Sequence, residues 1–112
     1  MEKNVMIGIL YEFYGDLLTD KQKETIELYY LEDLSLTEIA KIQKISKQGV
    51  SDSLKRSEIS LLNFENKLKM YEKSNEISNL INRLEQNLIE DMDDITFSKY
   101  IGLLFEIKSK LV

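Results

Sequence analysis

The sequence predicts an all-α protein, and three observations point to this fold class. Proline is absent, and only four of the 112 residues are glycine. Apolar residues recur at helical spacings of three and four, and Ser or Thr precedes several of these segments, where helix N-caps are expected. We therefore expect five or six helices and no strand.

The amino-terminal part of the chain should contain three helices. Gly15 is expected to end the first helix, which is predicted from the apolar side chains Val5, Ile9, Leu10, Phe13 and Leu17. Thr19 with Gln22, and Ser35 with Glu38, have the spacing of a capping box. A helix should therefore begin directly after Thr19 and another directly after Ser35.

A fourth helix is expected after Ser46, which can act as its N-cap, with a turn at Gln43 to Ile45 before it. Helical periodicity places Val50, Leu54, Ser57 and Leu61 on one side, opposite Gln48, Asp52, Lys55, Arg56 and Ile59. Neither proline nor glycine interrupts residues 50–71. The fourth helix is therefore expected to run on through residue 73.

Two short helices joined by a turn are typical of a helix-turn-helix, whose second helix enters the major groove of DNA. The nucleic-acid-binding residues predicted on this basis are Ser46, Lys47, Gln48, Ser51, Asp52, Lys55 and Arg56. Gln48 suits adenine, whereas Asp52 could accept from a cytosine amino group but would repel phosphates. The same pattern also joins two packed helices in any small bundle, and periodicity does not decide between these interpretations.

The distribution of charge matters more than the net charge of −5. Residues 1–36 contain 3 basic and 8 acidic groups, and residues 58–112 contain 7 and 10. Residues 37–57 contain 5 basic and 2 acidic groups, so the positive charge is concentrated at the predicted helix-turn-helix. A net acidic protein with one basic segment should bind duplex DNA weakly.

Residues 73–112 are expected to form a helical hairpin. Its first helix is predicted from Ile77, Leu80, Ile81, Leu84 and Leu88, and its second, over Phe97 to Leu111, from Tyr100, Ile101, Leu104, Phe105 and Ile107. The apolar face needs a partner surface, which is either the amino-terminal helices or a second copy of the chain. We thus expect a domain at residues 1–72 and an extension at residues 73–112 that packs on it or forms a homodimer.

Several function classes are disfavoured by composition. Histidine and cysteine are both absent, which removes the commonest general base and the strongest nucleophile, and no phosphate-binding glycine motif is present, so we expect a non-enzyme without a cofactor. The acidic cluster Glu90, Asp91, Asp93 and Asp94 lacks the EF-hand spacing and is expected to be a solvated loop without metal. No apolar run is long enough to span a membrane, and the lack of cysteine suits the cytoplasm.

The segment LLTDKQKETIELYYLEDLSLTEIAKIQKISKQGVSDSLKR resembles region 4 of bacterial sigma factors. With YEFYGDLL before it and LLNFENKLKMYE after it, the chain closely resembles the YlxM family of helix-turn-helix proteins over about residues 1–72. This resemblance implies a sigma-region-4-like helical fold and a bacterial source. It also implies a regulatory role connected with the signal recognition particle pathway.

The sequence departs from the family pattern at three positions of the helix-turn-helix. Gln43 replaces a commonly apolar residue, and Ile42 is expected to supply the missing contact. Lys44 stands where Asn or Gly is common, at a turn position that often adopts a left-handed conformation. Gly49 replaces Ala and should weaken the fourth helix.

Two functions from different classes remain open. The first is a regulatory DNA-binding protein that uses the predicted helix-turn-helix. The second is an interaction protein that retains this fold but contacts a protein or ribonucleoprotein of the secretion machinery, such as a signal recognition particle component. Net acidity and Asp52 favour the second, and the local basic cluster favours the first.

Overall fold

The computed structural model describes residues 2–111, which form six α-helices and no strand. This confirms the predicted all-α fold class. The helices are α1 (Lys3–Tyr14), α2 (Asp20–Ile26), α3 (Leu36–Gln43), α4 (Lys47–Leu68), α5 (Met70–Asp91) and α6 (Asp94–Lys110). A 3-10 turn, η1 (Gly15–Leu17), follows α1, and a π-helical segment, η2 (Glu27–Leu31), follows α2.

The chain divides into two compact units, unit 1 (Met1–Lys69) and unit 2 (Met70–Val112). The predicted continuation of the fourth helix through residue 73 is wrong, because α4 ends at Leu68. Lys69 has a left-handed backbone with φ 56°, and its N–H donates to the Glu65 carbonyl at 2.8 Å. A left-handed lysine has no sequence signature, since this conformation is expected of glycine or asparagine.

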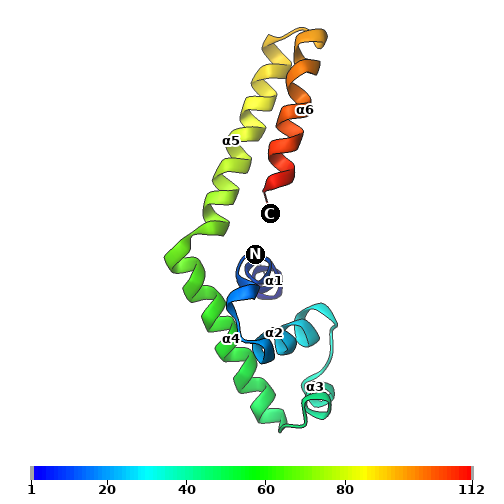
Figure 1. Ribbon diagram of the computed structural model, residues 1–112, viewed down its shortest axis with the longest axis vertical. Coiled ribbons are helices and arrows are strands. Elements are labelled where there is room, and N and C mark those ends of the chain that lie inside the picture. Colours follow the sequence, from blue (N-terminus) through cyan, green and yellow to red (C-terminus); the bar gives the residue numbers. More distant parts are fainter. Residues whose placement is uncertain (1, 112) are drawn as a thin grey trace. The chain divides into compact units, whose positions relative to one another are not determined.

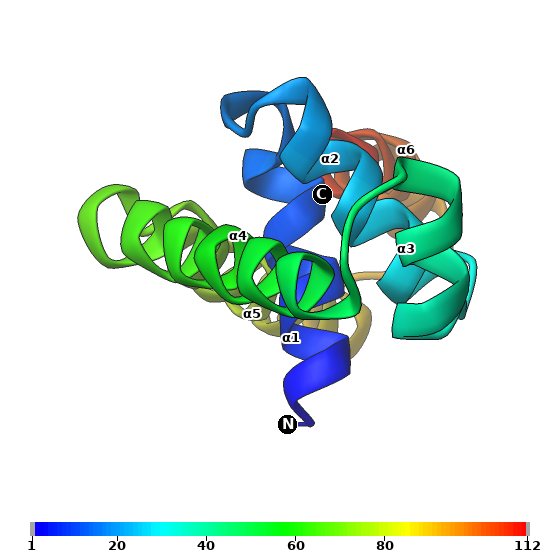
Figure 2. The same ribbon diagram turned by 90° about the horizontal axis from the view of Figure 1, so that it is seen from below.

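In unit 1, the helices α1, α2 and α3 all lie along the same side of α4, as Figure 1 shows, and α1 crosses α4 in the view of Figure 2. The side chains that fill the space between them are Ile7, Leu10, Tyr14, Leu18, Ile26, Ile39, Val50, Leu54 and Leu61, all almost fully buried. Because α4 contacts each of the three shorter helices, it is the central element of unit 1.

The apolar side chains from which α1 is predicted are only partly buried. Leu10 is buried as expected, but Val5 and Leu17 are 50% and 57% exposed. Ile7 and Tyr14 take the inner positions instead, and the Tyr14 hydroxyl donates to Glu65 Oε1 of α4 at 2.5 Å. The pattern of α1 permits either face, because apolar residues surround most of this helix.

The predicted helix starts in unit 1 are confirmed. The Thr19 side chain accepts from the Gln22 N–H at 3.2 Å, and the Gln22 side chain accepts from the Thr19 N–H. Ser35 and Glu38 form the second capping box in the same way. These bonds satisfy amide groups that have no partner within the helix, which is why local sequence predicts the starts well.

Unit 2 is the predicted hairpin of α5 and α6, with Ile81 and Leu104 buried between the two helices. The second helix begins before the predicted Phe97, because the Asp93 carboxylate caps it by accepting from the Thr96 N–H at 2.7 Å. An ion pair between Lys108 and Glu85 also joins the helices. Many apolar side chains remain more than 40% exposed within this unit, including Leu80, Leu84, Leu103, Phe105 and Ile107.

Candidate nucleic-acid interface

The connection between α3 and α4 has helix-turn-helix geometry. Lys44 ends α3 in a left-handed conformation, with φ 57° and ψ 42°, and the Ala40 carbonyl accepts from its N–H. The Ser46 side chain then caps α4 by accepting from the Gly49 N–H at 3.0 Å. The turn comprises residues 44–46, one position later than predicted, since Gln43 is still helical. Ile39 and Val50 are fully buried and form the shared core of the two helices.

The predicted division of α4 into an inner and an outer face is confirmed. Val50, Leu54, Ser57 and Leu61 are buried, together with Glu58, which the periodicity left unassigned. Lys47, Gln48, Lys55 and Arg56 are exposed, Ser51 and Asp52 are half-buried, and the Ser46 hydroxyl is engaged in the cap. All seven predicted binding residues therefore lie on the amino-terminal half of α4 or at its cap.

These residues lie along two edges of α4. On one edge, Asp52 and Arg56 line a groove of about 380 Å³ together with Thr19, Lys21 and Gln22 at the start of α2. On the other edge, Ser51 and Lys55 line a smaller hollow beside Tyr29 and Tyr30. Gln48 joins the first edge, because its Nε2 donates to Asp52 Oδ1 at 3.0 Å.

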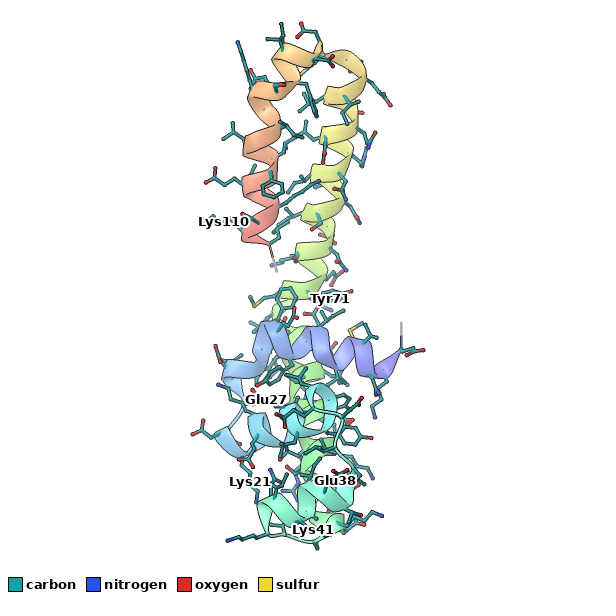
Figure 3. The ribbon with its side chains drawn as sticks, turned by 90° about the vertical axis from the view of Figure 1, so that its right-hand side faces the viewer. Lys21, Glu27, Glu38, Lys41, Tyr71 and Lys110 are labelled. Atoms are coloured by element: carbon teal, nitrogen blue, oxygen red, sulfur yellow. The ribbon has the colours of Figure 1, made fainter. Side chains whose placement is uncertain are left out.

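Lys21 is a cationic residue next to this face that sequence reasoning missed. It lines the same groove as Arg56, although 35 positions separate the two residues. Figure 3 shows Lys21 of α2 and Lys41 of α3 near the end of unit 1 where α3 turns into α4. In the sequence, the only feature that marked Lys21 was its position in the first turn of a capped helix. The fold alone places that turn beside α4.

The replacement of an apolar residue by Gln43 is accommodated differently from the expectation. Ile42 is 54% exposed and does not enter the core. The expectation that Ile42 supplies the missing apolar contact is therefore wrong. Gln43 itself turns inward, and its Nε2 donates to Thr25 Oγ1 of α2 at 2.9 Å. Its Oε1 is buried and has no hydrogen-bond partner within the described residues. A polar contact thus takes the place of an apolar one between α2 and α3.

Glu58 is a buried residue of α4 that bonds to side chains of two other elements. The residue is only 7% exposed, and its carboxylate accepts from the Tyr30 hydroxyl at 2.8 Å and pairs with Lys3 Nζ at 2.9 Å. Burial, followed by the bond to Glu58, raises the pKa of Tyr30. Tyr29 lies edge-on to Tyr30, with ring centroids 5.0 Å apart. Both tyrosines are half-buried, and the Tyr30 hydroxyl is engaged with Glu58.

The described part of the chain holds neither a clustered metal site nor a membrane-spanning helix. Residues 2–111 contain no group of three or more acidic side chains placed to hold a metal ion. The acidic cluster is exposed, but the predicted loop is wrong, because Glu90 and Asp91 end α5, Asp93 is the N-cap of α6 and Asp94 is its first residue. Among the helices that are described, none is both long and apolar enough to cross a membrane.

Comparison with known proteins agrees with the helix-turn-helix geometry of α3 and α4. A family model described as "Putative helix-turn-helix protein, YlxM / p13 like" matches residues 1–101. A UPF0122 protein of Thermoanaerobacter sp. (strain X514) is 50% identical over 84 residues, which cover 75% of this chain and 72% of the relative. A UPF0122 protein of Bacillus mycoides (strain KBAB4) is 43% identical over 91 residues, or 81% of this chain and 83% of the relative.

A third relative, from Anoxybacillus flavithermus, is 41% identical over 90 residues, which cover 80% of this chain and 82% of the relative. The matches extend beyond unit 1, since the family model includes all of α5 and the amino-terminal part of α6. The resemblance inferred from residues 1–72 is therefore confirmed over a longer part of the chain. This chain belongs to the UPF0122 family of YlxM/p13-like helix-turn-helix proteins.

Proposed function

We propose that this protein is a non-enzymatic regulator that binds duplex DNA with the amino-terminal half of α4. The observation that supports this function is the exposure of Lys47, Gln48, Lys55 and Arg56 directly after a turn of helix-turn-helix geometry. In this arrangement the second helix lies in the major groove and the first crosses the backbone. The lysines and Arg56 contact phosphates, and Gln48 faces the base edges.

Binding through this surface is weak. Lys47, Lys55 and Arg56, with Lys41 or Lys44, neutralise about four phosphates, which gives a slope of log K against log salt near −3.6. Non-specific affinity is typically weaker than about 1 μM at physiological salt. The net charge of −5 lowers it further, because the rest of the chain repels the phosphates.

Titration of a fluorescently labelled duplex with the full chain tests this proposal. At roughly 50 mM salt we expect a rise in anisotropy with increasing protein, and the rise should disappear at physiological salt. An absence of binding at protein concentrations up to about 100 μM would contradict DNA binding, since non-specific dissociation constants of DNA-binding proteins reach that range.

We further propose that the protein acts in the cytoplasm as a homodimer that pairs through the exposed apolar residues of unit 2. Supporting features are the absence of cysteine and the number of apolar side chains that α5 and α6 leave exposed. Two copies of α4 separated by about 34 Å would reach successive major grooves on one face of the duplex. Dimerisation would then strengthen DNA binding.

A second candidate function is contact with a protein or ribonucleoprotein partner, such as a signal recognition particle component. Two features favour this function. Residues 1–36 have a net negative charge, and unit 1 exposes apolar side chains, among them Val5, Leu17 and Leu31. A pull-down from native cytoplasm, with and without nuclease, separates the two functions. A partner that is retained after treatment with a deoxyribonuclease supports contact with a protein or ribonucleoprotein, whereas loss of all partners supports binding through DNA.

A further inference from the structure

A second groove of about 500 Å³ lies along α1, on residues that the helix-turn-helix does not contain. Val5, Gly8, Ile9, Tyr11, Glu12, Gly15 and Asp16 line one side, and Leu31 at the end of η2 lines the other. Val5 and Leu31 are 50% and 61% exposed. The groove therefore combines an apolar surface with ready access from solvent.

Gly8 leaves the backbone of α1 open at this groove. A methyl group added at Gly8 would meet no described atom within 4 Å, so the packing of unit 1 does not require glycine here. Glycine is less favourable than alanine in the interior of a helix. Its presence lets another polypeptide approach the α1 backbone closely, which a side chain at this position would prevent.

Tyr11 forms a fixed wall of the groove. Its ring packs against Gly15, where an added Cβ would lie only 2.9 Å from Tyr11 Cε2. Its hydroxyl donates to Glu27 Oε1 at 2.5 Å, and Figure 3 shows Glu27 next to α1. Burial, followed by this bond, raises the pKa of Tyr11 to about 12. The wall is thus held by contacts within unit 1 and does not need to form on binding.

The charge on the rim restricts the kind of occupant. The two charged side chains that line the groove are Glu12 and Asp16, and Glu27 holds the wall beside them. Lys23 pairs with Asp16 at 2.9 Å, but the Asp16 side chain is fully exposed and remains available to a second cation. Duplex DNA and other anionic partners are disfavoured here, whereas lysine and arginine would be attracted.

We propose that this α1 groove binds an amphipathic helix of a partner protein, with apolar residues against Val5, Gly8 and Leu31 and basic residues against Glu12 and Asp16. Apolar grooves commonly bind one face of an amphipathic helix through side chains at helical spacing. This inference rests on the second candidate function and gives that contact a location and a chemistry. It does not depend on DNA binding through α4.

The test uses a labelled helical peptide of about eighteen residues, made of leucine on one face and lysine on the other, with a leucine–glutamate peptide for comparison. Fluorescence anisotropy measures binding to the full chain, and amide chemical shifts locate the contact. We expect the lysine peptide to bind at least about tenfold more tightly than the glutamate peptide at low salt. The shifts should change at Val5, Gly8, Ile9 and Leu31.

Gly8→Gln fills the groove without changing the charge, and Gly102→Gln in α6 is its matched control, because Gly102 is equally free of neighbours within the described residues. Gly8→Gln should weaken peptide binding about tenfold, and Gly102→Gln should leave it within about twofold. Glu12→Gln provides an independent readout, with weaker binding and a smaller dependence on salt. Circular dichroism verifies that each variant is folded.

Any one of four results would overturn the inference. The first is equal binding of the two peptides, and the second is shift changes confined to unit 2. The third is a change in the mass of the unliganded chain on Gly8→Gln, which would make the groove a contact between copies. The fourth is an unchanged affinity for the peptide on Gly8→Gln. If a pull-down partner still survives nuclease treatment in that case, the second candidate function stands and only this groove is rejected.

Discussion

The side-chain amide of Gln48 donates a hydrogen bond to the carboxylate of Asp52 one helical turn later, with Nε2 3.0 Å from Oδ1. Both residues belong to the α4 surface that is proposed to face DNA. The bond holds the amide of Gln48 against its own helix, and a bidentate contact to adenine needs both the oxygen and the nitrogen of that amide. Asp52 therefore opposes DNA binding by repulsion of phosphates and by competition for Gln48.

Asp52→Asn should strengthen binding to duplex DNA. The asparagine can still accept from Gln48, but it removes a negative charge from the surface, which is expected to contribute about 1 kcal/mol, or roughly fivefold in affinity, at low salt. Anisotropy titration with a labelled duplex measures the change. Glu106→Gln on α6 alters the net charge equally and should have little effect; an equal gain in both variants would indicate that only net charge matters.

Replacement of Lys55 and Arg56 together by alanine should weaken binding to every duplex and flatten the salt slope by about two units, because two phosphate contacts are lost. Titrations at several salt concentrations provide the slope. Lys99→Ala with Lys110→Ala on α6 is the matched control for charge. If the control flattens the slope as much, α4 is not the DNA-binding surface.

Lys44→Gly should stabilise unit 1 by about 1 kcal/mol, because glycine adopts the left-handed conformation of this turn without the strain of a side chain. Lys41→Gly removes the same charge from the interior of α3 and should destabilise it by about 1 kcal/mol. Urea unfolding followed by circular dichroism gives both values. A destabilising effect of Lys44→Gly would show that the lysine side chain makes a compensating contact.

The capping box of α3 should make stability depend on pH in the acid range. The N–H of Ser35, followed by its hydroxyl, holds the pKa of Glu38 below its ordinary value of 4.5. The folded state therefore binds this proton less readily than the unfolded state, so the contribution is complete above pH 4.5 and is lost as pH falls through the lowered pKa. Thermal unfolding from neutral to acid pH should show a smaller change for Glu38→Gln than for the unsubstituted chain, and identical profiles would exclude a role for this carboxylate.

Self-association should depend on the exposed apolar face of α6. Phe105 is 75% exposed, and Phe105→Glu should convert a dimer into a monomer, because a charge in a buried contact is costly without a partner. Light scattering on the full chain at tens of micromolar measures the mass. Ser98→Glu, also on α6, introduces the same charge at an exposed polar position and should leave the dimer intact. A monomeric unsubstituted chain would contradict the proposed homodimer.

The sequence by itself determined the features that depend on neighbours within one helical turn. Thr19, Ser35 and Ser46 cap helices because each side chain accepts from an amide three residues later. The buried and exposed sides of α4 followed from the helical repeat in the same way, and with them the placement of the predicted binding residues. Family membership also followed from the sequence, because relatives share the order and spacing of the motif residues along the chain.

Tertiary structure alone decided the features whose partners are distant in sequence. Glu58 is a buried carboxylate only because Lys3 and Tyr30 reach it from other elements, and the amide of Gln43 turns inward only because Thr25 of α2 lies opposite. No local sequence pattern predicts these pairs, because glutamate and glutamine are residue types that usually lie on an exposed surface. The α1 groove likewise exists because η2 carries Leu31 to the side of α1, where packing and not periodicity chose which face of that helix to bury.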